Sequence, residues 1–502
     1  MTDNLDRLRE LLGVVSDIGH AAAVLNWDQQ TYMPRGGAGA RAMQLATLSR
    51  LAHEHFVSAE LQETLEKAKG EVVNLDPDSR DARLVKVTER ELRKRVKVPS
   101  AWVEEHSRVT AMAHQDWEQA RKDAQFSLFA PHLEKILALK REYANFFAPF
   151  DHIYDPLLED YEPGMKAADL QPVFARLRER QVPLIQAIME SGVTVDDAPV
   201  RMEFEEQKQW DFGVEVIKAF GYDFSRGRQD KAVHPFSTGF GTGDVRITTR
   251  FDTHFLNPAL FGTMHEAGHA MYEQGVDPQL ERSILEGGAS LGMHESQSRM
   301  WENLVGRSRP FWTAFYPRLQ KTFPAQTADV DLDGFYAAIN KVGRTFIRVD
   351  ADEATYNLHI MLRFELEMAL LAGELAVNDL PQAWDDKFET FFGVRPPDDA
   401  QGVLQDVHWS AGYIGYFPTY SLGNLIAAQL WEKIHVDIPD LEAQIEQAKF
   451  SDLLAWLREN IHQHGATFEP LELLERVVGT GLDVEPYLKY LETKFSEIYS
   501  LA

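Results

Sequence analysis

The chain has 502 residues, of which 44% are hydrophobic and 26% are charged, so it can bury the large core of an ordinary globular protein and is not a disordered chain. Its 51 basic and 78 acidic residues give a formal net charge of −27. A nucleic-acid partner would need a basic surface stripe that is missing here, and an anionic membrane would repel this acidic surface. The absence of cysteine excludes disulfides and thiolate metal sites, which leaves histidine and carboxylate side chains as possible metal ligands.

The composition indicates one large domain. Residues 1–7 lack the basic and apolar segments of a secretory signal, and no uncharged apolar run approaches the ~18 residues that span a bilayer, so we expect a cytoplasmic protein. No Ser-, Pro- or Gly-rich linker divides residues 1–502. We expect a helical part at about 1–230, a motif-bearing catalytic part at about 231–425 and a helical part at about 426–502, arranged as two lobes around a deep cleft.

Helical periodicity dominates the chain. Apolar residues recur at spacings of three and four, with charged residues on the outer faces, in the segments 4–25, 40–69, 79–95, 100–123, 130–147, 167–192, 205–220 and 355–376. We therefore expect a mostly α fold.

A short sheet is predicted between these helices, near residues 232–251. Residues 243–251 alternate apolar and polar side chains, as a half-buried strand does. We expect a small antiparallel sheet here, with a strand edge that could pair with an extended peptide and with Asp244 and Arg246 facing a cleft. The alternative is that Asp244 and Arg246 only fix a loop.

The next segment contains the most informative motif, His265-Glu266-Ala267-Gly268-His269. Residues four apart lie on one face of a helix, so both imidazoles can reach a single divalent ion, while the glutamate between them can take a proton from a water activated by that ion. Asn257-Pro258 resembles a helix N-cap followed by proline at the first helical position, and Gly275 is placed as a C-terminal glycine. The small residues Ala267 and Gly268 would let a neighbouring backbone approach the metal.

Two histidines leave a tetrahedral ion in need of a third protein ligand. We expect Glu295, 26 residues after His269, because Ser290 is a plausible N-cap for a helix that runs back past the first one. Four other carboxylates nearby in sequence remain possible third ligands: Glu273, Glu281, Glu286 and Glu302. Of these, Glu273 and Glu302 are better placed to orient the metal ligands than to bind the metal.

Farther along, Arg348 lies in a largely apolar stretch, where an unpaired guanidinium would be costly and an anionic partner is expected. The partner could be the free carboxylate of a peptide substrate. It could equally be an internal aspartate, Asp350 or Asp352.

Residues 408–420 are rich in groups that donate hydrogen bonds without being acidic at neutral pH, which suits a site that binds an oxyanion. The candidates are His408, Tyr413, Tyr416 and Tyr420. For each tyrosine the alternative is a core aromatic with a satisfied hydroxyl.

Taken together, these motifs resemble the thermostable carboxypeptidase family, the M32 metallocarboxypeptidases. The resemblance rests on five motifs in the order of the family, between about residues 244 and 409: Asp244-Val245-Arg246-Ile247-Thr248, His265-Glu266-Ala267-Gly268-His269, His294-Glu295-Ser296-Gln297, Ile347-Arg348-Val349-Asp350-Ala351-Asp352 and Gly402-Val403-Leu404-Gln405-Asp406-Val407-His408-Trp409.

This resemblance implies specific roles. His265, His269 and Glu295 would bind the metal, Glu266 would be the general base, and Arg348 would bind substrate. Zinc suits two imidazoles and a carboxylate best, with cobalt or manganese as alternatives. The resemblance also implies a homodimer.

Residues 408–417 are, in addition, similar to the His and Tyr-Ile-x-Tyr-Phe pattern of peptidyl dipeptidases of the angiotensin-converting type. That similarity implies that Tyr416 stabilises the oxyanion, Tyr413 contacts the terminal carboxylate and His408 holds a substrate carbonyl. Tyr420 is a further candidate for substrate binding.

We therefore expect a zinc-type metallocarboxypeptidase that acts on peptides with a free C-terminus. A peptidyl dipeptidase or oligopeptidase would share the metal site. A non-catalytic metal-binding scaffold is the alternative from another class, and Glu266 argues against it because a structural site needs a fourth ligand and no base.

Overall fold

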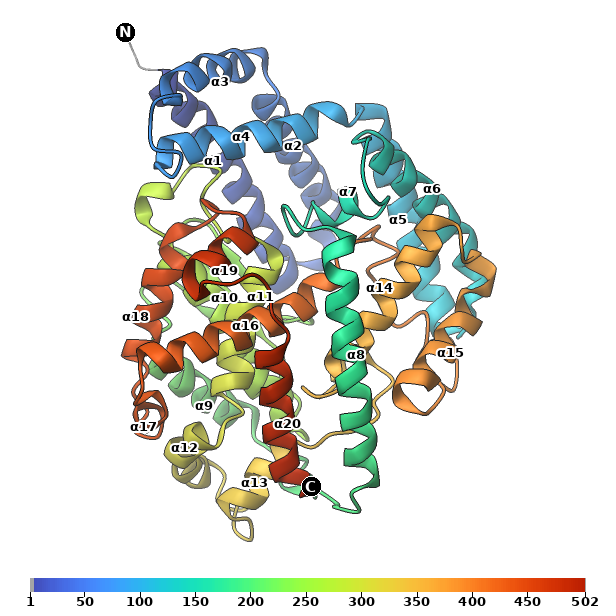
Figure 1. Ribbon diagram of the computed structural model, residues 1–502, viewed down its shortest axis with the longest axis vertical. Coiled ribbons are helices and arrows are strands. Elements are labelled where there is room, and N and C mark those ends of the chain that lie inside the picture. The colour runs from blue at the N-terminus through green and yellow to red at the C-terminus, as the bar shows by residue number, and fades with distance from the viewer. Residues whose placement is uncertain (1–3, 502) are drawn as a thin grey trace.

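The computed structural model describes residues 4–501 and is mostly α-helical, as the periodicity predicts. Figure 1 shows the N-terminal helices at one end of the molecule and the last helix, α20, descending beside α8. The helices are α1 (Asn4–Thr31), α2 (Ala38–Phe56), α3 (Ala59–Val72), α4 (Arg80–Lys97), α5 (Ser100–Lys122), α6 (Ala130–Asn145), α7 (Asp155–Leu158), α8 (Ala167–Glu190), α9 (Glu206–Phe220), α10 (Leu256–Gly275), α11 (Leu291–Arg299), α12 (Arg309–Thr322), α13 (Leu332–Ile339), α14 (Tyr356–Ala372), α15 (Leu380–Phe392), α16 (Pro418–Asp437), α17 (Leu441–Ile445), α18 (Ser451–Asn460), α19 (Pro470–Val478) and α20 (Glu485–Tyr499).

The prediction of one continuous helix over residues 40–69 is wrong, because the segment forms two helices. The chain forms α2 and α3 with a break at residues 57–58, because Ser58 is extended and its Oγ accepts a hydrogen bond from the backbone N–H of Leu61 (3.2 Å). This N-cap starts a new helix where the apolar periodicity alone continues. Each of the other predicted segments corresponds to one helix.

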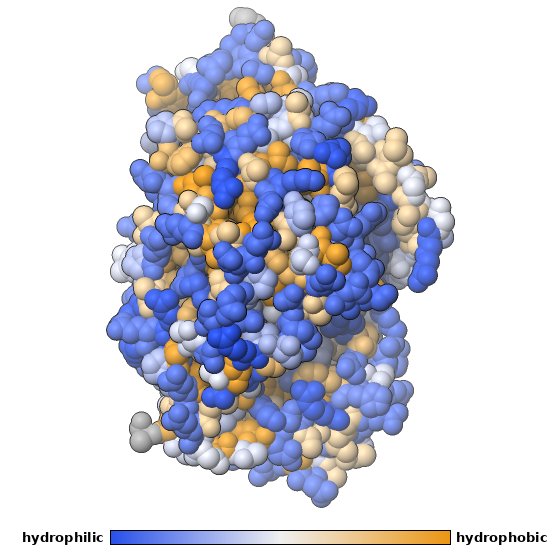
Figure 2. Space-filling view, turned by 90° about the vertical axis from the view of Figure 1, so that its right-hand side faces the viewer, coloured by the Kyte–Doolittle hydropathy of each residue, from blue (hydrophilic) through white to orange (hydrophobic). Residues whose placement is uncertain are grey.

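The buried hydrophobic side chains form two clusters. The larger one runs through the middle and the C-terminal half of the molecule, and the smaller one joins α1, α3 and α4 to the loop after α10 through residues such as Leu8, Leu65 and Leu285. Figure 2 shows one face of the molecule, on which hydrophilic side chains predominate and hydrophobic ones lie scattered between them. No helix within residues 4–501 is both long and apolar enough to cross a membrane.

The sheet has three short strands, β1 (Gln229–Lys231), β2 (Ser237–Gly239) and β3 (Val245–Thr249), in the order β1-β3-β2. The pair β2–β3 is antiparallel as predicted, but β1 pairs with β3 in parallel, so the sheet is mixed. The predicted free edge on residues 243–251 is also wrong. Because β3 is the central strand, both of its edges are already paired.

The helix that carries the first motif is α10, and it packs against β3 and α11 near the middle of the molecule (Figure 1). It begins at Leu256, with Phe255 in the extended N-cap position, so the predicted cap at Asn257 lies inside the first turn instead. The bridge between Asp252 and Phe255 ends the preceding segment and sets this earlier start. Gly275 is the last residue of α10, in agreement with the sequence.

Candidate metal centre and active site

The helices α10 and α11 come into backbone contact at the first motif. A Cβ atom at Gly268 would lie 2.6 Å from the Cα of Ser298 and 2.7 Å from the carbonyl oxygen of Gln297, so only glycine permits this approach. Helix α11 starts where the sequence predicts, since the Ser290 Oγ accepts a hydrogen bond from the N–H of Met293 (3.0 Å). The small residues of the motif therefore bring α11 beside the histidines.

His265 and His269 on α10 and Glu295 on α11 converge. The Glu295 Oε2 lies 3.7 Å from the His265 Nε2 and 3.6 Å from the His269 Nε2, and the three donor atoms all lie within 4.8 Å of one another. Donor atoms bound at 2.0–2.2 Å in a tetrahedron lie roughly 3.3–3.6 Å apart, so this group fits one divalent ion with a position left open. Within residues 4–501, no other group of three His, Asp or Glu side chains converges in this way.

The second nitrogen of each imidazole has its own partner. The His265 Nδ1 donates to the Glu302 Oε2 at 2.8 Å, which fixes the ring with its Nε2 toward Glu295. The His269 Nδ1 and the His294 Nδ1 are 3.0 Å apart, and the His294 Nε2 lies 3.5 Å from the Glu273 Oε1. Glu302 and Glu273 thus support the imidazoles from behind, as groups that orient metal-binding histidines do.

The remaining two rivals for the third ligand have other partners. The Glu281 Oε1 accepts a hydrogen bond from the N–H of Thr242 (2.9 Å), and the Glu286 Oε2 accepts one from the N–H of Arg282 (2.8 Å). Neither joins the converging group, so Glu295 is the carboxylate that the structure places there.

Glu302 lies in a π-helical turn, Met300–Val305, which continues α11. The extra residue per turn shifts the side-chain direction, and such turns occur often at functional sites. The sequence predicts a continuous helix here, because its apolar pattern does not distinguish the two kinds of turn.

Arg299 joins the two glutamates of this region. Its Nε donates to the Glu295 Oε1 (2.7 Å), and its Nη1 lies 3.2 Å from the Glu302 Oε2. Burial favours the neutral carboxyl forms, but Arg299 outweighs it, so the pKa of Glu302 falls to about 2 and the pKa of Glu295 falls well below its usual range. Sequence reasoning missed Arg299, although its position four residues after Glu295 is the signal that could have revealed the pair.

Glu266 is 7% exposed and lies between the two histidines in sequence. No hydrogen bond or salt bridge to another residue of the described chain, 4–501, holds its carboxylate. Burial raises its pKa above the ordinary value, against the attraction of His265 and His269. A buried carboxylate of raised basicity is well suited to accept a proton.

Residues 408–420 bring three of the predicted hydrogen-bond donors together. The His408 Nε2 lies 3.2 Å from the Tyr420 hydroxyl, and the Tyr416 ring lies 5.3 Å from the His408 ring and 5.4 Å from the Tyr420 ring. Burial, reinforced by the charge of Glu295, raises the pKa of Tyr416 to about 12, so its hydroxyl stays protonated. Tyr413 is 48% exposed and its ring stacks 5.9 Å from that of Tyr416, which places it at the rim of the group.

Arg348 is buried, and its internal partner is neither Asp350 nor Asp352, so the alternative of an internal aspartate named the wrong residues. Its Nε and Nη2 donate to the Asp406 Oδ1 at 3.0 and 2.8 Å, and its Nη1 donates to the Tyr356 hydroxyl at 2.9 Å. Asp352 instead accepts hydrogen bonds from nearby backbone groups, including the N–H of Gly343 (2.9 Å). Spacing along the chain could not find Asp406, which is 58 residues away, although it lies in the motif at residues 402–409.

The cluster around Arg348 carries excess positive charge. Arg363 is also fully buried, and its Nε donates to the Asp406 Oδ2 at 2.6 Å, so two guanidinium groups share one carboxylate. The Arg348 guanidinium lies 4.9 Å from the centre of the Tyr420 ring, which links the cluster to the hydroxyl groups described above. A buried net positive charge is costly unless an anion joins it.

Asp244 and Arg246 pair with each other through two hydrogen bonds of 2.8 and 2.7 Å. The Arg246 guanidinium lies 4.3 Å from the Trp27 ring on α1 and 4.9 Å from the Phe240 ring. Within residues 4–501, neither residue forms a hydrogen bond or a salt bridge with His265, His269 or Glu295. Asp244 and Arg246 therefore hold each other beside α1.

Comparison with known proteins gives matches over nearly the whole chain. The family model described as carboxypeptidase Taq (M32) metallopeptidase matches residues 7–495. The chain is 42% identical to thermostable carboxypeptidase 1 of Thermus thermophilus over 505 residues, covering 99% of this chain and 98% of the relative. It is 38% identical to carboxypeptidase 1 of Bacillus subtilis over 492 residues, covering 98% of each.

Solved structures agree with these relatives. The crystal structure of an M32 carboxypeptidase from Deinococcus radiodurans R1 has a TM-score of 0.96, with 43% identity and 99% of both chains covered. A structure of the Pyrococcus furiosus carboxypeptidase has a TM-score of 0.95, with 37% identity and 99% of both chains covered.

Proposed function

The chain belongs to the carboxypeptidase Taq (M32) family of metallopeptidases, and from this premise we propose that it is a zinc-type carboxypeptidase that releases single amino acids from the C-termini of peptides. The observation that carries the proposal is the convergence of His265, His269 and Glu295 beside a buried carboxylate, Glu266, that has no hydrogen-bond or salt-bridge partner among residues 4–501.

His265, His269 and Glu295 would hold the ion, because their donor atoms have the spacing and the chemistry that zinc prefers. When bound, such an ion supplies Lewis acidity, which makes a water molecule more acidic and polarises a carbonyl. Cobalt or manganese could occupy the same ligand set, since both bind imidazole and carboxylate groups.

The residues of the chain divide the proton chemistry between them. Glu266 accepts a proton from the attacking water and later returns it to the leaving amine. Tyr416, protonated at neutral pH, donates a hydrogen bond to the developing oxyanion. Burial lowers the pKa of His408 to about 3, so its ring is neutral and can hold the adjacent carbonyl through a ring N–H.

The positive cluster supports recognition of a free C-terminus. Arg348 would bind the terminal carboxylate, since it shares Asp406 with Arg363 and the three groups together retain one positive charge. Tyr420 lies beside the guanidinium, and Tyr413 lies at the rim, from which it would contact the same carboxylate. Asp244 and Arg246 would form a wall of the cleft without contacting the reacting atoms.

Mass spectrometry of one digested decapeptide tests this function. We expect successive loss of single C-terminal residues, and a C-terminally amidated copy of the peptide should be cut far more slowly. Loss of dipeptides or internal cuts would instead support a peptidyl dipeptidase or oligopeptidase. No cleavage of either peptide, with the metal bound, would support the non-catalytic scaffold.

Replacing Glu302 by glutamine tests the support of the metal ligands. The variant E302Q should bind zinc about 10- to 100-fold more weakly, because the His265 Nδ1 loses its charged acceptor. Competition with a chromophoric chelator measures this affinity. The exposed Glu215 on α9 offers a matched control as E215Q, which should bind as the parent does. Equal zinc affinity of E302Q and E215Q would contradict the role of Glu302.

Three finer proposals accompany this function. We propose that residues 1–502 act as one peptidase domain, that the protein works in the cytoplasm, which a chain without cysteine suits, and that it forms a homodimer, as the resemblance to the family implies. Light scattering on the purified protein measures its mass in solution, and the mass of a single chain, 57.1 kDa, would contradict the dimer.

A further inference from the structure

The hydrogen-bond donors His408 and Tyr416 lie in a segment without regular structure. Residues 393–417, between α15 and α16, form neither helix nor strand, so no regular ladder of backbone hydrogen bonds fixes these two side chains. A group that stabilises a transition state must be held to within about 0.5 Å of its productive position. The contacts that hold residues 406–417, here called the donor loop, should therefore come from neighbouring elements.

Glu367 on α14 bonds to the donor loop beside each of these two donors. Its Oε1 accepts a hydrogen bond from the Trp409 Nε1 (2.8 Å), and its Oε2 accepts one from the backbone N–H of Gly415 (3.1 Å). Trp409 directly follows His408 in the chain, and Gly415 directly precedes Tyr416. One carboxylate therefore ties the backbone next to both donors to α14.

The helix α14 is a firm support for this carboxylate. Arg363, one turn before Glu367, donates to the Asp406 Oδ2 at 2.6 Å, so the same helix also holds the start of the donor loop. Arg363 and Glu367 are both fully buried. A third donor to Glu367 lies outside the donor loop, since the hydroxyl of Tyr154, the residue before α7, bonds to the Glu367 Oε2 at 2.7 Å.

The donor loop is confined from its other side at Gly415. The φ angle of Gly415 is +91°, and a Cβ atom there would lie 2.9 Å from the carbonyl carbon and oxygen of Leu157 on α7, so only glycine fits. The next residue, Tyr416, meets the Tyr161 ring edge-on at 5.1 Å. The Tyr161 carbonyl accepts a hydrogen bond from the N–H of Leu291 (3.2 Å), the first residue of α11. The loop thus lies between α14 and a segment that contacts the metal-binding helix.

We propose that Glu367 is a positioning residue of the active site, which holds the Tyr416 hydroxyl and the His408 ring where the oxyanion and the adjacent carbonyl of the substrate would lie. The inference rests on the carboxypeptidase function proposed above and deepens it by naming the group that sets the geometry of the oxyanion site. Glu367 acts through Trp409 and Gly415 and does not touch the reacting atoms. Its loss should lower kcat with little effect on KM, because the oxyanion forms only in the transition state.

The variant E367Q tests this role. A glutamine amide has one oxygen that accepts and one nitrogen that only donates, so in either orientation the Trp409 Nε1–H or the Gly415 N–H loses its acceptor. We expect kcat for an N-blocked dipeptide to fall about 10- to 100-fold, with KM changed less than about twofold. The zinc content per chain should equal that of the parent, since within residues 4–501 none of the three metal-binding side chains bonds to Glu367.

The variant Y154F is the matched control at the same carboxylate. Phenylalanine removes the hydrogen bond from Tyr154 to the Glu367 Oε2 and leaves both bonds to the donor loop. Each variant loses one buried hydrogen bond to or from residue 367, so a role in stability alone predicts similar kinetics for the two. We expect Y154F to keep kcat within about twofold of the parent. Equal kcat values for E367Q and Y154F would overturn the proposal.

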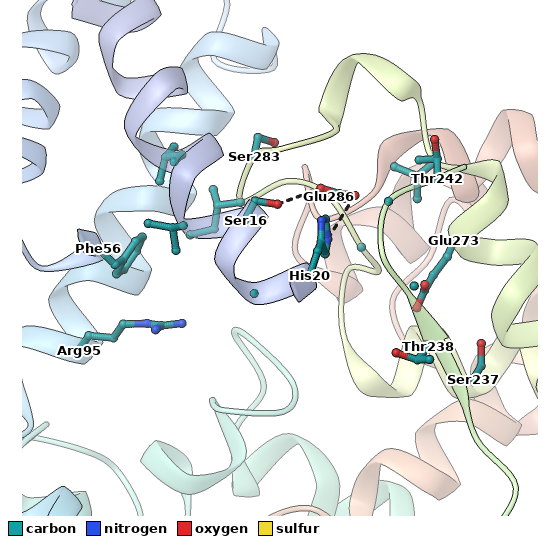
Figure 3. A pocket seen from close by; sticks show the side chains of 18 residues that line it. Ser16, His20, Phe56, Arg95, Ser237, Thr238, Thr242, Glu273, Ser283 and Glu286 are labelled. Atoms are coloured by element: carbon teal, nitrogen blue, oxygen red, sulfur yellow. Dashed lines mark hydrogen bonds and ion pairs between the residues drawn. The ribbon is translucent and has the colours of Figure 1, made fainter. Parts of the chain in front are cut away.

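A second control lies away from this region. Across a cavity of about 480 Å³ that is bordered by α1, β2 and the loop after α10, the Ser16 hydroxyl donates to the Glu286 Oε2 at 3.4 Å (Figure 3). Among residues 4–501, the side chains that line this cavity include none from the donor loop or from α14. S16A therefore removes a polar contact to a carboxylate without touching the donor loop, and it should keep the parental kcat. The same drop in S16A as in E367Q would contradict a specific role of Glu367.

The background Y416F shows whether Glu367 acts through the donor loop. Without the Tyr416 hydroxyl, displacement of the loop has less to disturb, so E367Q should lower the kcat of Y416F by at most about threefold. Loss of folded enzyme would instead lower kcat by one common factor in Y416F and in the parent. That common factor would show that Glu367 supports the fold and does not position Tyr416.

Hydrogen exchange tests the anchor on the unaltered enzyme, in case E367Q fails to fold. The Gly415 amide donates to a buried carboxylate, so it should exchange at least about 10²-fold more slowly than an unprotected amide. Exchange at the unprotected rate would show that Glu367 does not hold the loop. Failure of the carboxypeptidase function is distinct, because the parent would then leave the blocked dipeptide intact while the Gly415 amide stayed protected.

Discussion

Glu266→Gln is expected to lower kcat about 10³-fold while the metal stays bound, because the amide keeps the shape of the side chain but cannot accept the proton. None of the three converging side chains bonds to Glu266, so the substitution leaves them in place. Steady-state kinetics on a blocked dipeptide and elemental analysis of the purified variant measure the two quantities together. E215Q is the matched control, and hydrolysis by E266Q at the parental rate would show that another group accepts the proton.

Arg348→Gln is expected to reduce kcat/KM for peptides with a free C-terminus by about 30- to 4,000-fold, chiefly through KM. Truncating one partner of a buried charge pair costs about 2–5 kcal/mol, and here the partner is the terminal carboxylate. The fold should survive, because Asp406 keeps Arg363 as a partner and the cluster becomes neutral. The measurement is a comparison of R348Q with the parent on a peptide acid and on the corresponding peptide amide.

The amide substrate provides the control for that prediction. The amide lacks the negative charge that Arg348 would bind, so R348Q and the parent should have similar kcat/KM values on it. The parent-to-variant ratio of kcat/KM on the acid, divided by the same ratio on the amide, then measures the contact between Arg348 and the terminal carboxylate. If the kcat/KM of R348Q falls by the same factor on the acid and on the amide, Arg348 supports the structure and does not recognise the C-terminus.

The metal centre could be predicted from the sequence because its two parts are local. The spacing of His265 and His269 on one helix fixes their common face, and Ser290 sets the start of the helix that carries Glu295. Glycine at position 268 reveals that the two helices touch. These are properties of neighbouring residues, which periodicity and capping describe well.

The groups that hold the site from behind were harder to predict because they depend on tertiary contacts. Asp406 reaches Arg348 from 58 residues away, and no pattern within either segment fixes that pairing. The nearby Asp350 and Asp352 were the natural choice from spacing, and the fold uses Asp352 to accept backbone hydrogen bonds. The parallel pairing of β1 was missed for a similar reason, since three residues carry too little alternation to reveal a strand.

The central claim is that His265, His269 and Glu295 jointly hold one divalent ion. Anomalous diffraction from crystals of the zinc-loaded protein, recorded on both sides of the zinc absorption edge, tests it most directly. The account predicts one strong peak for each chain, about 2.0–2.2 Å from the two Nε2 atoms and from the Glu295 carboxylate. A zinc-loaded protein with no peak between these three side chains, or with its peak elsewhere in the chain, would contradict it.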